Sequence, residues 1–121
     1  MTIFKLKWFH KWAEKEDLTD KALQKAIPEM EQGLIDADLG GHVYKKRVGI
    51  KGRGKSGGVR TLIAFQLENR AFFMYGFAKN KRDNIDDNEL SALKILAKKM
   101  LNYTDKELSK AIEVGEIIEV L

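Results

Sequence analysis

The chain has 121 residues, a net charge of +4 and no cysteine. This length is typical of one ordinary domain, and we expect residues 1–121 to form a single one. Without cysteine, neither disulfides nor cysteine-ligated zinc can form, as is usual in the reducing cytosol. No apolar run approaches the roughly 18–20 residues of a membrane span, and the N-terminus lacks a signal-peptide pattern. These features predict a soluble, cytoplasmic protein.

The first third of the chain predicts a strand followed by two helices. Residues 2–6 predict the strand, which leads into a helix with Trp8 and Trp12 at helical spacing. Thr19 is a typical N-cap for the second helix, and Gly33 ends the helical pattern. The inner face of the second helix is expected to carry Leu23, Ala26, Ile27 and Met30.

The middle third predicts three consecutive antiparallel strands. Residues 43–48 alternate in character, so that Lys45 and Arg47 project from the same face. Residues 59–67 alternate more clearly, and residues 71–79 return after a tight turn as the third strand.

The last third predicts helices and one more strand. An amphipathic helix is expected from Asp83 onward, with its aspartates first and its lysines last, as the helix dipole favours. The capping box at 104–107 starts a short helix that Gly115 closes, and EIIEVL can add an edge strand. We expect residues 103–121 to be an appendage. The predicted class is therefore α+β, a small antiparallel sheet with two N-terminal helices and a C-terminal helix, one sheet face open.

Positive charge is concentrated in the middle of the chain. Residues 42–82 hold eleven Lys and Arg against one acid, Glu68. Cations gathered on one contiguous unit indicate a polyanionic partner. The glycine-rich segment 49–58 resembles nucleotide-binding loops, but no helix is predicted to follow it, which disfavours a nucleotide site. We expect this segment to be a flexible loop that carries Lys51, Arg53 and Lys55.

We expect these cations to meet at one end of the sheet and bind an RNA backbone. The glycine-rich loop would fold over the bound strand, and Tyr75 could stack on a base. A cleft of Lys and Arg can stabilise charge on a phosphorane, and a crowded lysine can accept a proton. Cleavage of RNA without histidine is therefore physically reasonable. The basic region has no carboxylate pair and no metal-binding cluster, and no metal or cofactor is predicted. The expected RNA-binding residues are Arg47, Lys51, Arg53, Arg82 and Tyr75.

One long stretch resembles a known family. DADLGGHVYKKRVGIKGRGKSGGVRTLIAF, followed by RAFFMYGFAKNKRDNI, is similar to toxins of type II toxin–antitoxin modules in the RelE/ParE superfamily, in the HigB-like branch. The resemblance covers about residues 8–101 and is most specific over 36–85. It implies a compact ribonuclease-like α+β domain. It also implies mRNA cleavage in the ribosomal A site without metal, leaving a cyclic phosphate, and a cognate antitoxin that often carries a helix-turn-helix DNA-binding domain.

The resemblance also implies roles for particular residues. Lys45 and Arg47 match basic residues of the family's second strand, and Arg60 matches the arginine of its S-G-x-R element. Asn80 stands where some members have a catalytic arginine, and Asp86 stands where some have a tyrosine. The expected catalytic residues are Arg60 with Lys79 or Lys81 on the scissile phosphate, and Lys45 or Lys55 for proton transfer.

Three functions remain open at this point. The first is a ribosome-dependent mRNA endonuclease toxin. The second is a ParE-like toxin that binds a protein target such as DNA gyrase. The third is an RNA-binding module without catalytic activity.

Overall fold

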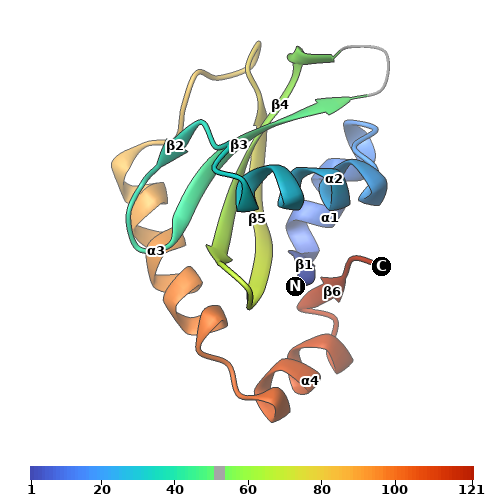
Figure 1. Ribbon diagram of the computed structural model, residues 1–121, viewed down its shortest axis with the longest axis vertical. Coiled ribbons are helices and arrows are strands. Elements are labelled where there is room, and N and C mark those ends of the chain that lie inside the picture. Colours follow the sequence, from blue (N-terminus) through green and yellow to red (C-terminus); the bar gives the residue numbers. More distant parts are fainter. Residues whose placement is uncertain (51–53) are drawn as a thin grey trace.

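The structure is a computed structural model that describes residues 1–50 and 54–121, and no side chain from 51 to 57. Helices precede and follow a central group of strands (Figure 1). This is the predicted α+β organisation, which is confirmed. In chain order the elements are β1 (Thr2–Leu6), α1 (Lys7–Lys15), α2 (Asp20–Glu31), β2 (Ala37–Asp38), β3 (Val43–Ile50), β4 (Gly54–Gln66), β5 (Arg70–Ala78), α3 (Asp87–Leu101), α4 (Asp105–Glu113) and β6 (Ile117–Glu119).

The strands of the described residues form one sheet in the order β2-β3-β4-β5-β1-β6. The antiparallel series β3, β4 and β5 was predicted and is confirmed. The sheet is mixed, however, because the N-terminal strand β1 runs parallel to β5. Phe4 lies opposite Phe72 in this pair, and their rings stack with centroids 5.0 Å apart. Strand β6 then pairs antiparallel with the other side of β1, so the predicted edge strand joins the main sheet.

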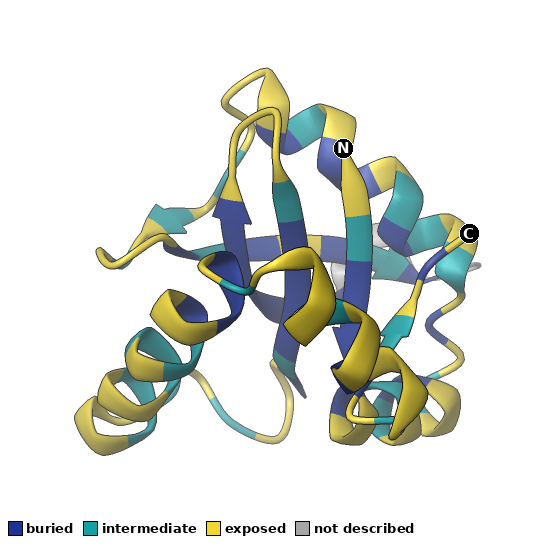
Figure 2. Ribbon diagram, turned by 90° about the horizontal axis from the view of Figure 1, so that it is seen from below, coloured by how far each residue is buried: buried dark blue, intermediate teal, exposed yellow. Residues whose placement is uncertain are grey.

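Helices cover both faces of the sheet. Helices α1 and α2 pack on one face, where Trp12 lies over Gly76 of β5. Helix α3 packs on the opposite face, against β3, β4 and β5. The prediction of an open second face is therefore wrong, because Leu62 and Ala64 on that face are fully buried. Figure 2 shows buried strands enclosed by helices whose outward sides are exposed.

Two lysines attach α2 to the sheet. The Nζ atom of Lys46 in β3 lies 2.8 Å from Oε1 of Glu29, and the Nζ atom of Lys5 in β1 lies 2.6 Å from Oδ1 of Asp20. Both lysine side chains are buried. Because an ammonium group out of water is costly unless it is paired, these contacts fix α2 across β1 and β3.

Side-chain caps set where the helices begin. Thr19 accepts a hydrogen bond from the backbone N–H of Ala22, as predicted for the start of α2. Helix α3 begins at Asp87 and not at Asp83, because Asp86 and Glu89 form a capping box. The predicted capping box at 104–107 is confirmed and starts α4. Asp86 therefore has a structural role as the N-cap of α3.

The glycine-rich segment differs from its prediction. Strand β3 continues to Ile50 and strand β4 begins at Gly54, with these two residues opposite each other. The expected loop over 49–58 is therefore wrong for its described residues, since glycine without a side chain still forms ladder hydrogen bonds. Lys51 and Arg53 lie outside the described residues, and so does the side chain of Lys55.

The contact between Trp12 and Gly76 leads to a test of packing. A Cβ atom at residue 76 would lie 2.1 Å from a ring carbon of Trp12. The backbone at Gly76 is outside the left-handed region, so alanine itself brings no backbone strain. We therefore expect Gly76→Ala to lower the free energy of unfolding by about 1–3 kcal/mol, measured by urea denaturation. In a Trp12→Leu background the same substitution should cost much less. An equal cost in both backgrounds would contradict the steric explanation.

Candidate nucleic-acid interface

A row of three residues crosses the sheet on the face where α3 packs. Arg47 of β3 lies opposite Arg60 of β4, which lies opposite Phe77 of β5. Directly opposed residues share a face, so the two guanidinium groups and the aromatic ring belong to the same side of the sheet. The register of the hairpins thus brings together cations that are 13 positions apart in the sequence.

Arg60 is the most unusual member of this row. The residue is only 6% exposed, and its Nη1 atom is buried with no hydrogen-bond partner in the described part of the chain. Burying a polar group without a partner is costly, and the cost is greater for a charged one. A guanidinium group presents several donors in a fixed planar fork that fits phosphate and carboxylate oxygens. The Nη1 donor of Arg60, which has no acceptor among the described residues, is therefore suited to an oxygen of a bound anion.

The two basic residues of β3 on this face are less buried. Lys45 is half-buried and lies opposite Leu62. Arg47 is exposed, and its Nε atom lies 3.5 Å from Oδ1 of Asp36, so part of its charge is already compensated. The predicted alternation of Lys45 and Arg47 against Lys46 is confirmed, because Lys46 reaches α2 on the opposite face.

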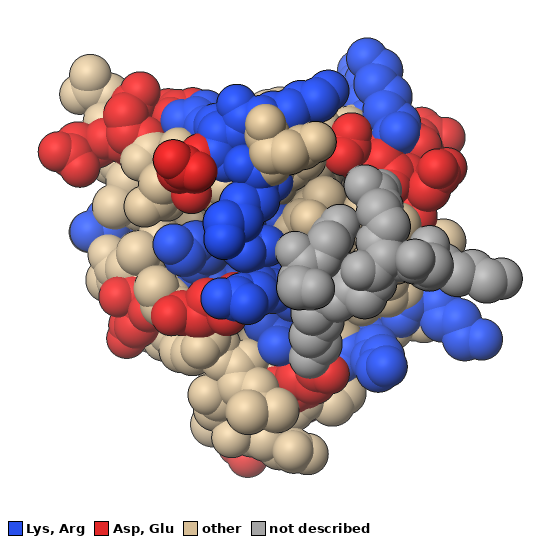
Figure 3. Space-filling view, turned by 90° about the horizontal axis from the view of Figure 1, so that it is seen from above, with Lys and Arg blue, Asp and Glu red and all other residues tan. Residues whose placement is uncertain are grey.

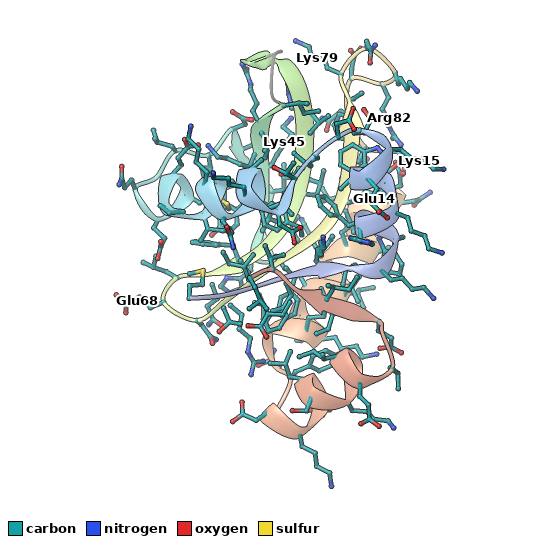
Figure 4. The ribbon with its side chains drawn as sticks, turned by 90° about the vertical axis from the view of Figure 1, so that its right-hand side faces the viewer. Glu14, Lys15, Lys45, Glu68, Lys79 and Arg82 are labelled. Atoms are coloured by element: carbon teal, nitrogen blue, oxygen red, sulfur yellow. The ribbon has the colours of Figure 1, made fainter. Side chains whose placement is uncertain are left out.

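The segment after β5 supplies the next cations. The backbone N–H groups of Lys81 and Arg82 both donate to the carbonyl of Ala78, at 3.0 and 3.3 Å, which folds the segment back at the end of the strand. Lys79 and Lys81 are exposed, and neither has an ion pair with another described residue. Figure 4 shows Lys79, Arg82 and Lys45 in the same half of the molecule, toward the end of β3 and the start of β4. Seen from above, Lys and Arg side chains gather across this end (Figure 3).

Arg82 is held by several partners. Its Nε donates to the carbonyl oxygen of Asn84 at 2.8 Å, and its Nη atoms donate to the two carboxylate oxygens of Glu89 at 3.1 and 2.6 Å. It also donates to the hydroxyl of Tyr75 at 3.2 Å and lies 5.8 Å from the ring centroid of Phe77. These contacts link the segment after β5 to the first turn of α3. Arg82, predicted as an RNA contact, is in this structure mainly a group that orders the segment.

The pKa values of this pair follow from the same contacts. The hydrogen bonds from Arg82, and then the backbone N–H of Asp86, hold the pKa of Glu89 below its ordinary value. The hydrogen bond to Glu89 raises the pKa of Arg82 further. Both groups therefore stay charged at neutral pH, and the link between β5 and α3 is an ion pair.

Sequence reasoning missed three residues next to these cations. No role was assigned to Glu89 from the sequence, although an acid seven positions after an arginine can bridge a turn. Trp8 and Trp12 were placed on the first helix by their spacing alone. Trp8 is 55% exposed, and its indole N–H donates to the carbonyl of Met74 at 2.7 Å. Its amphipathic ring made this orientation possible, but the periodicity gave no sign of it.

Two further features concern metal ions and membranes. Among the residues the structure describes, no three His, Asp or Glu side chains lie close enough together to share a metal ion. No helix in the described part of the chain has the length and apolar character that crossing a bilayer requires.

Comparison with known proteins identifies the family. The family model of the RelE toxin of the RelE/RelB toxin–antitoxin system matches residues 1–120. The chain belongs to the RelE toxin family. No curated protein matches the chain. Membership in the RelE family extends the resemblance noted over residues 8–101 to α4 and β6, and it implies a cognate antitoxin as partner.

The Arg82–Glu89 pair predicts a local effect of acid. A carboxylate whose pKa is lowered by folding stabilises the folded state above its ordinary value of 4.5, and this contribution is lost as pH falls through the lowered pKa. We therefore expect Glu89→Gln to destabilise the protein at pH 7 and to have a shrinking effect below about pH 4.5. In urea titrations over this range, the difference from the unmodified protein should close in acid.

Glu107 gives a matched control. It has the same place in the capping box of α4, and the backbone N–H of Thr104 lowers its pKa in the same direction. Glu107→Gln should leave hydrogen exchange of the 79–86 amides unchanged, whereas Glu89→Gln should accelerate it. Equal exchange of these amides in the two variants would contradict the anchoring role of Glu89.

Proposed function

We propose that this member of the RelE family is a ribosome-dependent endoribonuclease that inhibits translation by cutting mRNA without a metal ion. The observation that carries the proposal is Arg60, a buried arginine with an unpartnered Nη1 atom on the same sheet face as Lys45. The free-energy cost of burying this guanidinium group is explained if a bound phosphate supplies the missing hydrogen-bond acceptor. Lys79 and Lys81 add positive charge on the segment that follows β5. Both side chains are exposed, and neither has a carboxylate partner among the described residues.

The reaction uses a nucleophile that RNA itself carries. The 2′-oxygen attacks the adjacent phosphorus and loses its proton, the bond from phosphorus to the 5′-oxygen breaks, and that oxygen gains a proton. The products are a 2′,3′-cyclic phosphate and a 5′-hydroxyl. Arg60 with Lys79 or Lys81 stabilises the charge on the phosphorane oxygens. Lys45 or Lys55 accepts the proton of the 2′-hydroxyl as the general base.

Further parts of the proposal concern the branch and the partners. The stretch from Asp36 to Ile85 supports the HigB-like branch of the superfamily. The antitoxin is then a small protein with a helix-turn-helix DNA-binding domain, and the toxin acts in the cytoplasm on ribosomes. Residues 1–121 are taken as one domain, since β6 pairs with β1 in the same sheet.

Arg60→Met separates function from stability. Replacing a buried, incompletely paired charge by an apolar side chain of similar length is often neutral or stabilising. We therefore expect Arg60→Met to fold with equal or higher stability in urea, while mRNA cleavage falls by about 100-fold or more. Cleavage is measured by primer extension on transcripts in a purified translation reaction, with and without ribosomes.

Arg70→Met is the matched control. Arg70 is a half-buried arginine at the opposite end of β5, where it donates to the carbonyl of Tyr103 at 2.7 Å. Its loss should lower stability and leave cleavage by the folded fraction intact. If Arg60→Met stayed fully toxic and the unmodified protein cut no transcript, the gyrase-binding alternative would replace this proposal. If the protein bound RNA but never shortened it, the non-catalytic alternative would.

A further inference from the structure

An aromatic hollow lies beside the candidate interface. It has a volume of about 260 Å³ and opens between α1, the second half of β5 and the segment after it. The lining residues that matter here come from α1, from β5 beyond the end of its pairing with β1, and from the segment after β5: Trp8, Trp12, Tyr75, Phe77, Lys81 and Arg82. A concave site with apolar walls and a few polar groups is the usual form of a site for a small planar group.

The hollow follows from the way β1 ends. The pairing of β1 with β5 stops at Lys5 and Phe73, and α1 starts directly after β1 and packs on the rest of β5. The hydrogen bond from Trp8 to the carbonyl of Met74 fixes one indole. The absence of a side chain at Gly76 allows the Trp12 ring to lie on the strand. The walls are therefore positioned before any ligand arrives.

The charges beside the hollow favour a nucleotide. Lys81 is exposed and has no ion pair with another described residue. Phe77 lines the hollow and is also the residue directly opposite Arg60 in the sheet. An aromatic wall and a phosphate-binding arginine are thus neighbours across one pair of strands. A nucleotide has the same two parts, a planar base and an anionic phosphate, joined by one sugar.

We propose that this hollow binds a nucleobase of the RNA strand, next to the phosphate held at Arg60. The inference rests on the proposed function, and it assigns to Trp8 and Trp12 a role that the sequence did not indicate. The exposed face of Trp8 stacks on the base, because stacking on aromatic side chains is the main way in which proteins hold unpaired bases. Lys81 contacts the phosphate of the same nucleotide.

Both tryptophans of the chain line this hollow, so intrinsic fluorescence reports on it directly. The probe is a dinucleotide with a 2′-deoxy sugar before the linkage, which cannot be cleaved. We expect it to change tryptophan fluorescence in a saturable way. Ribose 5-phosphate and inorganic phosphate, which lack a base, should cause no such change at the same concentration. An equal response to ribose 5-phosphate would overturn the proposal.

Variants locate the binding. Trp8→Leu leaves Trp12 as reporter, and we expect it to weaken dinucleotide binding by about tenfold to hundredfold. Lys81→Ala, at an exposed position, should also weaken binding and does not depend on repacking α1. Ile95→Ala, an exposed apolar residue of α3 that is 73% accessible, serves as the control and should bind as the unmodified protein does. Unchanged affinity in both Trp8→Leu and Lys81→Ala would contradict the assignment.

The same titration separates this inference from the proposed function. Saturable dinucleotide binding without transcript cleavage would support the hollow and contradict the nuclease. Cleavage without any fluorescence response would support the nuclease and overturn the hollow. A response to a short acidic peptide containing one tyrosine, with none to the dinucleotide, would reassign the hollow to a protein partner and overturn the proposal as stated.

Discussion

The placement of the N-terminal strand inside the sheet is the constraint on which much of the structure depends. Strand β1 lies parallel to β5 and antiparallel to β6, so it joins the central hairpins to the C-terminal segment. Because α1 follows β1 without a loop, the helix must pack where β1 ends, on the second half of β5. That position brings Trp8 and Trp12 to the candidate interface. The pairing of β1 with β5 thus determines where β6 joins the sheet and where the two tryptophans of α1 lie relative to the cations.

The central strand β4 has a different importance. It carries the fully buried Leu62, Ile63 and Ala64 and, on the same strand, the nearly buried Arg60. A folded protein gains stability from the three apolar residues and loses some of it to the unpartnered guanidinium nitrogen. Local violations of folding rules are expected at functional sites, where another interaction compensates them. In this chain the violation lies at Arg60, an arginine that the family resemblance also matches.

Much of the fold could be predicted from the sequence because its signals are local. The alternation in 59–67, the N-cap Thr19 and the capping box at 104–107 each depend on neighbouring residues, and the structure confirms all three. The failures involve contacts between distant segments. Neither the parallel pairing of β1 with β5 nor the packing of α3 on the second face has a local signature.

The predictions for the candidate site divide in the same way, into local features that were predicted and distant contacts that were not. Alternation indicated that Lys45 and Arg47 share a face, and this needed only the period of a strand. Side-chain partners could not be predicted in this way, because they depend on which helix covers which face. The pairing of Arg82 with Glu89 and the orientation of Trp8 toward Met74 both depend on helix packing. The prediction of a loop over 49–58 failed for a related reason. Composition does not reveal that Ile50 and Gly54 pair across a hairpin.

The internal ion pairs change what the chain's positive charge can do. Lys46, Arg47, Arg70 and Arg82 all lie in the cationic middle third, and each already has a carboxylate within 4 Å. A cation neutralised from inside the protein releases few condensed counterions from a nucleic acid, because it cannot also take the place of those ions at a phosphate. The ionic-strength dependence of the proposed RNA binding is then governed by the remaining basic side chains. A charge count taken from the sequence overstates the electrostatic attraction, and shape must supply more of the selectivity.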